Sequence, residues 1–156
     1  MRRTTALVVA VATMISWGLI GNATAGNPQT MTFIVDVGSG ASIGMGPGGM
    51  GGSIMTGGGP VILNNQQFGM MMHTSMTGTM QDMMGQPQTR MHHDMDFDIP
   101  GQGTVFAVMT GGNPWTGGKG MIMGGTDTLK GISGTFTVGD QVGSNRFQFN
   151  CTFTLP

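Results

Sequence analysis

Methionine and histidine side chains that can bind a soft metal ion are concentrated in the middle of the chain. Methionine accounts for 18 of the 156 residues, against three histidines, one cysteine and no tyrosine. Thioether sulfur and imidazole nitrogen are donors that favour Cu(I) over Mg²⁺, Ca²⁺ or Mn²⁺. The sequence predicts a Cu(I) site, and the residues assigned to it are Met91, His93 and Met95, with Met70, Met71, Met72, His73 and Met76 as supporting ligands.

A strictly alternating segment, residues 90–99, positions the first three candidates. Met91, His93 and Met95 fall on one face, and same-face neighbours in a strand lie about 6.6–7 Å apart, so their side chains can converge on one ion. The segment is predicted to be a half-buried strand with an apolar inside. Its outer face carries an acidic row that fits a solvated strand and also a weak site for a harder divalent cation: His92, Asp94, Asp96 and Asp98.

The same residues also fit a structural interpretation. Methionine is an adaptable filler of apolar interiors, so Met91 and Met95 can be core residues beside Phe97. His93 is then a buried histidine that is satisfied by hydrogen bonds. The density of methionine in this part of the chain exceeds what gap filling requires, and both interpretations stay open.

The supporting ligands lie in residues 68–80, which are predicted to form one or two strands of uncertain register. In a strand, Met71 and His73 share one face, whereas Met70 and Met72 share the other. All four can therefore reach one ion only if this segment is a loop.

The first 25 residues have the pattern of a signal peptide. Arg2 and Arg3 precede an apolar stretch over residues 6–20, and Ala23-Thr24-Ala25 is an A-x-A cleavage site. The expected mature chain, residues 26–156, is exported to a periplasm or the cell exterior and contains no segment long enough to span a membrane. It keeps four of the six basic residues against seven aspartates, a formal charge of −3. Nucleic acid and anionic membranes are poor partners for such a charge.

The mature chain is predicted to be one all-β domain. Short strands separated by glycine-rich turns favour an antiparallel barrel or a sandwich. Turns are expected at Asn64-Asn65 and at Gly139-Asp140. Residues 38–60 are dominated by glycine, with methionines five residues apart that match neither a strand nor a helix period. They are predicted to form a flexible Gly/Met-rich loop.

One glycine-rich segment resembles a known family. Gly118 to Thr135, which reads GKGMIMGGTDTLKGISGT, is similar to the signature of allene-oxide-cyclase-like and dirigent-like barrels, in which a strand ends in Gly-Gly-Thr-Gly. Asp127 stands at the position of the last glycine of that pattern. The resemblance implies an antiparallel barrel of about eight strands, whose small interior holds one small ligand. It places no catalytic residue of the family on this sequence.

The interpretation that fits these features best is an exported, non-enzymatic β-barrel that captures Cu(I) as a chaperone, scavenger or buffer. A second interpretation is a barrel that binds a small lipophilic ligand or acts as an isomerase. A third is a structural protein without a ligand, whose methionines are filler or oxidant sinks. The oligomeric state, including a homo-oligomer, is left open. A blue-copper centre is not expected, because Cys151 lies in an apolar strand with no histidine after it.

Overall fold

The computed structural model describes residues 26–38, 41–45, 52–81, 83–111 and 117–156 as an all-β structure with one short 3₁₀ turn, η1. The elements in chain order are β1 (Gln29–Asp36), β2 (Ala41–Met45), β3 (Gly52–Leu63), β4 (Gln66–Gln81), β5 (Pro87–Ile99), β6 (Gly103–Gly111), β7 (Lys119–Gly125), η1 (Asp127–Leu129), β8 (Ser133–Gly143) and β9 (Arg146–Thr154).

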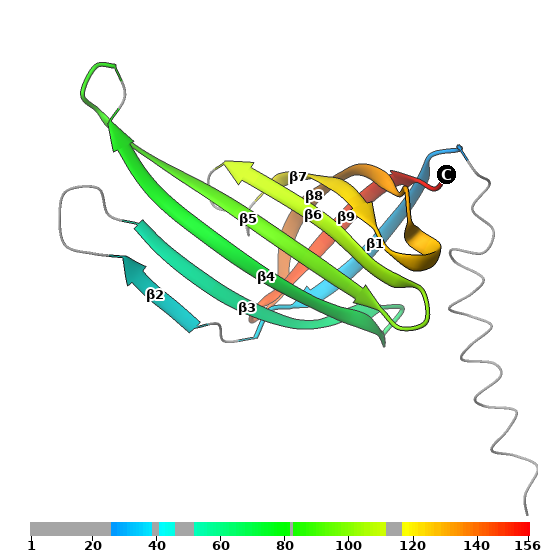
Figure 1. The fold of residues 1–156 in the computed structure, drawn as a ribbon. Helices are drawn as coiled ribbons and strands as arrows, with labels where there is room; N and C mark the ends of the chain where they lie inside the picture. The colour runs from blue at the N-terminus through cyan, green and yellow to red at the C-terminus, as the bar shows by residue number, and fades with distance from the viewer. Residues whose placement is uncertain (1–25, 39–40, 46–51, 82, 112–116) are drawn as a thin grey trace, which may run out of the picture.

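Eight of the strands close into an antiparallel barrel, as the sequence predicted (Figure 1). The order is β1-β9-β8-β7-β6-β5-β4-β3, and β3 returns to β1 through the pairs Ile34–Ile62 and Val35–Val61. The remaining strand, β2, pairs with β3 beyond this closure. A barrel of eight strands has an interior just wide enough for side chains or one small ligand.

The prediction of a flexible loop over residues 38–60 is wrong for residues 41–45 and 52–60, which form β2 and most of β3. The glycines of β3 allow close approach to both neighbouring strands, β1 at the closure of the barrel and β4 on the other side. A Cβ atom on Gly59 would lie 1.6 Å from the carbonyl oxygen of Asp36, and one on Gly58 would lie 2.4 Å from that of Met71. These glycines therefore reflect tight backbone packing, which composition alone does not distinguish from flexibility.

Two predicted turns have different outcomes. Asn64 and Asn65 do form the tight turn between β3 and β4, with φ values of 51° and 62°. The turn predicted at Gly139-Asp140 is wrong, because β8 continues to Gly143 with an irregular register. Glycine within a strand commonly marks such an irregularity. Residues 68–80 belong to one long strand, β4.

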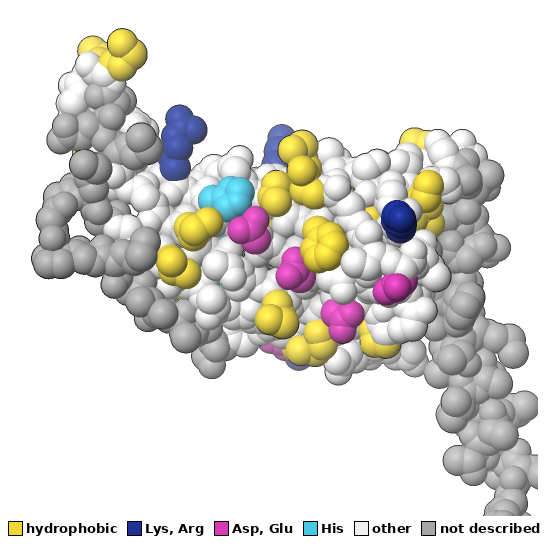
Figure 2. All heavy atoms as spheres, viewed as in Figure 1, with side chains coloured by type: hydrophobic (Ala, Val, Ile, Leu, Met, Phe, Trp, Pro, Cys, Tyr) yellow, Lys and Arg dark blue, Asp and Glu magenta, His cyan; other side chains and the backbone are white. Residues whose placement is uncertain are grey.

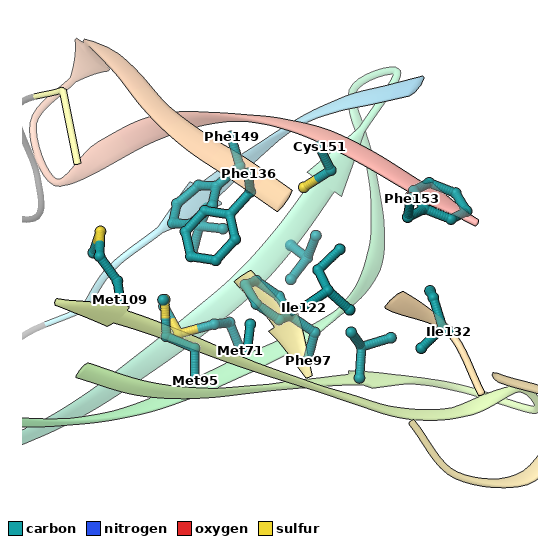
Figure 3. Close-up of a cluster of buried hydrophobic side chains, with 14 of the residues drawn as sticks. Met71, Met95, Phe97, Met109, Ile122, Ile132, Phe136, Phe149, Cys151 and Phe153 are labelled. Atoms are coloured by element: carbon teal, nitrogen blue, oxygen red, sulfur yellow. The ribbon is translucent and has the colours of Figure 1, made fainter. Parts of the chain in front are cut away.

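The core is built from phenylalanine rings in the middle of the barrel. Phe149 is fully buried and stacks on Phe33 and Phe136, with ring centroids 5.6 and 5.7 Å apart, and Phe97 meets it edge-on. Figure 3 shows part of this group, together with side chains toward both ends of the barrel. Cys151 lies in a strand, β9, as predicted, and it is buried together with Phe149 and Phe153.

Residues 1–25, which carry the predicted signal peptide, lie outside the described part of the chain. Within the described residues, no helix is long and apolar enough to cross a membrane.

Candidate functional site

Two adjacent strands bring the histidine candidates together inside the barrel. In the antiparallel register of β4 and β5, His73 pairs with Met95 and Ser75 pairs with His93. Side chains directly opposite each other on one face have Cβ atoms about 4.5–5.5 Å apart. All four residues are buried, with exposed fractions of 1–5%. The predicted inward face of β5 is therefore confirmed, including its burial of His93 and Met95.

Two further thioethers border these residues. Met109 on β6 pairs with His93, and it is 2% exposed. Met71 lies two residues before His73 on β4 and is fully buried. In Figure 3, Met71, Met95 and Met109 lie toward one end of the core, opposite Phe153. We call this group the interior Met–His cluster: Met71, His73, Ser75, His93, Met95 and Met109.

A hydrogen-bonded chain joins the polar members of the cluster. Ser75 Oγ lies 3.2 Å from His73 Nδ1 and also hydrogen-bonds His93 Nδ1. A serine hydroxyl carries one hydrogen and two lone pairs, so it can donate to one imidazole while it accepts from the other. The two neutral rings are then opposite tautomers. One carries its lone pair on Nε2, and the other carries a proton there.

The interior keeps both imidazoles neutral. Burial, with lesser contributions from the neighbouring His73 and His92 and against an opposing effect of Asp94, lowers the pKa of His93 from the ordinary 6.5 to about 4. Burial also lowers the pKa of His73. Neutral imidazole is the form that binds metal ions, because its unprotonated nitrogen supplies the lone pair.

The structure separates three supporting candidates from this cluster. Met70, Met72 and Met76 point out of the barrel, with exposed fractions of 44%, 68% and 43%. From Met70 to Gln81, β4 pairs with β5 without a register shift, so Met70, Met72 and Met76 lie on the face opposite to His73 and cannot share an ion with it. Met91 is on the inward face but is only half-buried, opposite Thr77 and Gly111.

Sequence reasoning missed two members, Ser75 and Met109. Both have a signal in the sequence, because Ser75 alternates with His73 and Met109 follows from the register of a hairpin that turns at Pro100-Gly101. A prediction from residue type alone passed over both, since serine is a weak ligand and Met109 lies apart from the methionine-dense segment.

The donors in the cluster are two neutral imidazoles and three thioethers. Within the described residues, no group of three or more His, Cys, Asp or Glu side chains is placed to hold a metal ion. A metal ion at the cluster would therefore be held partly by methionine sulfur. Cys151 takes no part in this chemistry as a thiolate, because burial raises the pKa of its thiol to about 12.

A separate cavity of about 60 Å³ lies toward the other end of the barrel. Its lining is wholly apolar, and it includes Phe68, Ile122, Leu129, Ile132 and Phe153. Phe97 and Ala107 border this cavity; Met95 lies two residues before Phe97 on β5, and Met109 lies two residues after Ala107 on β6. The interior thus has a thioether–imidazole region and an apolar region.

Comparison with known proteins identifies the architecture only. No family model and no curated protein matches the sequence. Among solved structures, pyocyanin demethylase is similar, with a TM-score of 0.61 and 19% sequence identity over 81% of this chain and the whole of that protein. At this identity the similarity supports the barrel fold.

Proposed function

We propose that this chain is an exported β-barrel protein that binds Cu(I) in its interior Met–His cluster and acts as a copper chaperone, scavenger or buffer. One observation carries the proposal. In the described part of the chain, the buried polar side chains are His73, Ser75 and His93, and they are joined to one another beside three buried thioethers. An apolar barrel that needed only filler has no evident use for this arrangement, because buried polar groups cost stability unless they are fully satisfied.

The charge of the donors favours a monovalent ion. Every proposed ligand is neutral, so nothing in the cluster offsets the cost of bringing the charge of the ion into an apolar interior. That cost rises steeply with charge and is smaller for Cu(I) than for a divalent ion. Thioether and imidazole donors favour the same ion, because Cu(I) is soft.

Export is the natural setting for such a protein. The twin basic residues, apolar stretch and Ala-Thr-Ala site at the start of the chain support secretion. Reversible capture of copper outside the cytoplasm requires no catalytic residue, which agrees with a non-enzymatic role.

A competition titration with a chromophoric Cu(I) chelator, under anaerobic reducing conditions, tests this function. We expect the mature chain to withdraw Cu(I) from the chelator. Met95→Leu and Met109→Leu remove sulfur but nearly conserve volume. Each substitution should lower the affinity for Cu(I) at least roughly tenfold, because loss of an outer-sphere partner alone has an effect of about that size. Met121→Leu, at an exposed position on β7, is the matched control. Failure to compete at any protein excess would overturn the proposal.

The apolar cavity favours a second candidate function, the binding of a small lipophilic molecule. Its volume of about 60 Å³ is smaller than the roughly 150 Å³ of a cavity that admits benzene, so only a very small ligand fits without rearrangement. The similar solved barrel is named for the demethylation of pyocyanin, an activity that would need a larger cavity in this chain. Xenon binding followed by ¹²⁹Xe NMR, abolished by Ala107→Leu, would support this candidate.

The allene-oxide-cyclase-like and dirigent-like resemblance remains a proposal of its own. Asp127, at the position of the last signature glycine, has a φ of 49°. Because glycine is favoured at positive φ, this conformation explains why the family pattern would place glycine there and supports the resemblance.

A further inference from the structure

The outer face of the β4–β5 pair carries a second combination of thioether and imidazole. Met76 on β4 pairs directly with His92 on β5. Both are accessible, with exposed fractions of 43% for Met76 and 42% for the His92 side chain. Figure 2 shows hydrophobic side chains interspersed with acidic ones and a histidine on one outer face of the barrel.

A neighbouring carboxylate holds the His92 ring. Asp94 follows on the same face of β5, and its Oδ1 lies 3.1 Å from His92 Nε2. In the neutral ring, Nε2–H donates to the carboxylate, and the lone pair is then on Nδ1. Histidines that bind metal ions almost always donate their other ring N–H to a carboxylate, carbonyl or water, which fixes the tautomer and raises the basicity of the ligating nitrogen.

We propose that Met76 Sδ and His92 Nδ1 form a second, solvent-facing site for a soft monovalent ion, Cu(I) or Ag(I), with Asp94 as its positioning residue. The directly opposed side chains have Cβ atoms about 4.5–5.5 Å apart, within reach of one ion between their tips. A two-donor site is weaker than the interior cluster. It is also open to exchange with solvent, because both donors are half exposed.

The two sites lie on opposite faces of the same stretch of sheet. Ser75 and His93 point into the barrel, and Met76 and His92, their neighbours in sequence, point out. The outer site does not depend on the interior cluster, since the two share no donor. Ion capture at the outer face can therefore be tested independently of the proposed function.

The chain offers a matched control on the same face. Met72 is more exposed than Met76, but its partner across the strands is Asp96 rather than a histidine. If an exposed thioether were sufficient for ion binding, loss of Met72 would weaken binding as much as loss of Met76. If the thioether–imidazole pair is required, only loss of Met76 weakens binding.

Titration of the metal-free mature chain with Ag(I), followed through the ¹⁵N signals of the three histidine rings, tests the outer site. We expect the Nδ1 signal of His92 to shift on binding. Met76→Leu should lower the Ag(I) affinity reported by this signal at least tenfold. Asp94→Asn should also lower this affinity, and Met72→Leu should leave it unchanged.

The same spectra distinguish the two proposals. Shifts at His73 and His93 with none at His92 would overturn the outer site and leave the interior site standing. A His92 response that is equal in wild type and Met76→Leu would also overturn it. A His92 response without shifts of His73 and His93 would support the outer site and count against the proposed function.

Discussion

At the scale of single residues, Ser75 decides what the two buried histidines can do. It is the shared hydrogen-bonding partner of His73 Nδ1 and His93 Nδ1. When it gives its hydrogen to one ring and accepts from the other, one Nε2 carries a lone pair in the metal-free protein. Binding of one ion by both Nε2 atoms would require the second ring to move its proton to Nδ1, where the hydroxyl oxygen can accept it.

The tautomers of the two buried rings are directly measurable. In metal-free protein at neutral pH, we expect ¹⁵N–¹H correlation spectra to show one ring protonated at Nδ1 and the other at Nε2. Ser75→Ala removes the shared partner, so the opposite pairing should be lost while the barrel keeps its backbone spectrum. Identical tautomers in the wild type, or an unchanged pair in Ser75→Ala, would contradict this role.

Burial of His93 makes stability depend on pH. Its folded pKa of about 4 lies below the unfolded value of 6.5, so the unfolded chain binds more protons between these values. Stability is then complete above pH 6.5 and falls as the pH decreases toward 4. Urea unfolding of the metal-free chain should show a loss of about 2 to 3 kcal/mol between pH 7.5 and 4.5.

The His93→Gln variant is the control for this pH dependence, because glutamine has no charge to gain. We expect a much flatter profile, with a smaller residual slope from His73, whose pKa is also lowered by burial. An equally steep profile in His93→Gln would show that another group causes the pH dependence of stability.

At the scale of the elements, the seam between β1 and β3 holds the barrel closed. Gly59 lies against the backbone of Asp36 at this seam, where no side chain fits. Through the turn at Asn64 and Asn65, β3 continues into β4, and its Gly57 pairs with His73 without placing a side chain beside the imidazole. The glycine segment therefore supports the site indirectly.

The seam gives a prediction with a control on the neighbouring strand. Gly59→Ala would force its Cβ atom onto a carbonyl oxygen, and we expect a loss of about 3 kcal/mol in the free energy of unfolding. Gly78→Ala, on β4, meets nothing within 4 Å and should be neutral or stabilising by up to about 1 kcal/mol. Equal stability of the two variants in thermal or urea unfolding would contradict the role of the seam.

The sequence predicts the face of β5 but not the seam. Strict alternation in residues 90–99 is sufficient to place His93 and Met95 inside the barrel. The assignment of the supporting ligands depended on whether residues 68–80 form a strand, and that depends on pairing with β3 and β5. Because β3 is rich in glycine and has no alternating pattern, its tertiary contacts decide its conformation.

At the scale of the whole molecule, methionine is divided between two environments. In the described part, eight of the ten exposed large hydrophobic side chains are methionine. Three others, in the interior cluster, are at most 2% exposed. Packing in the core does not account for the methionines outside the barrel.

This division predicts the order of oxidation. Mild hydrogen peroxide should convert Met83, Met84 and Met72 to sulfoxides first, because susceptibility follows exposure. Met71 and Met95 should react only when the barrel unfolds. Peptide mass spectrometry at increasing peroxide checks this order, and equal rates in folded protein would contradict it.

The central claim, that thioether and imidazole donors inside the barrel bind Cu(I), is tested most directly by X-ray absorption at the copper edge. The sample is the His92→Gln variant, which lacks the outer site, loaded with one equivalent of Cu(I). We predict a sulfur shell together with imidazole nitrogen scattering, and a reduced sulfur contribution when Met95→Leu is added. A spectrum without sulfur ligands, or one that Met95→Leu and Met109→Leu leave unchanged, would contradict the claim.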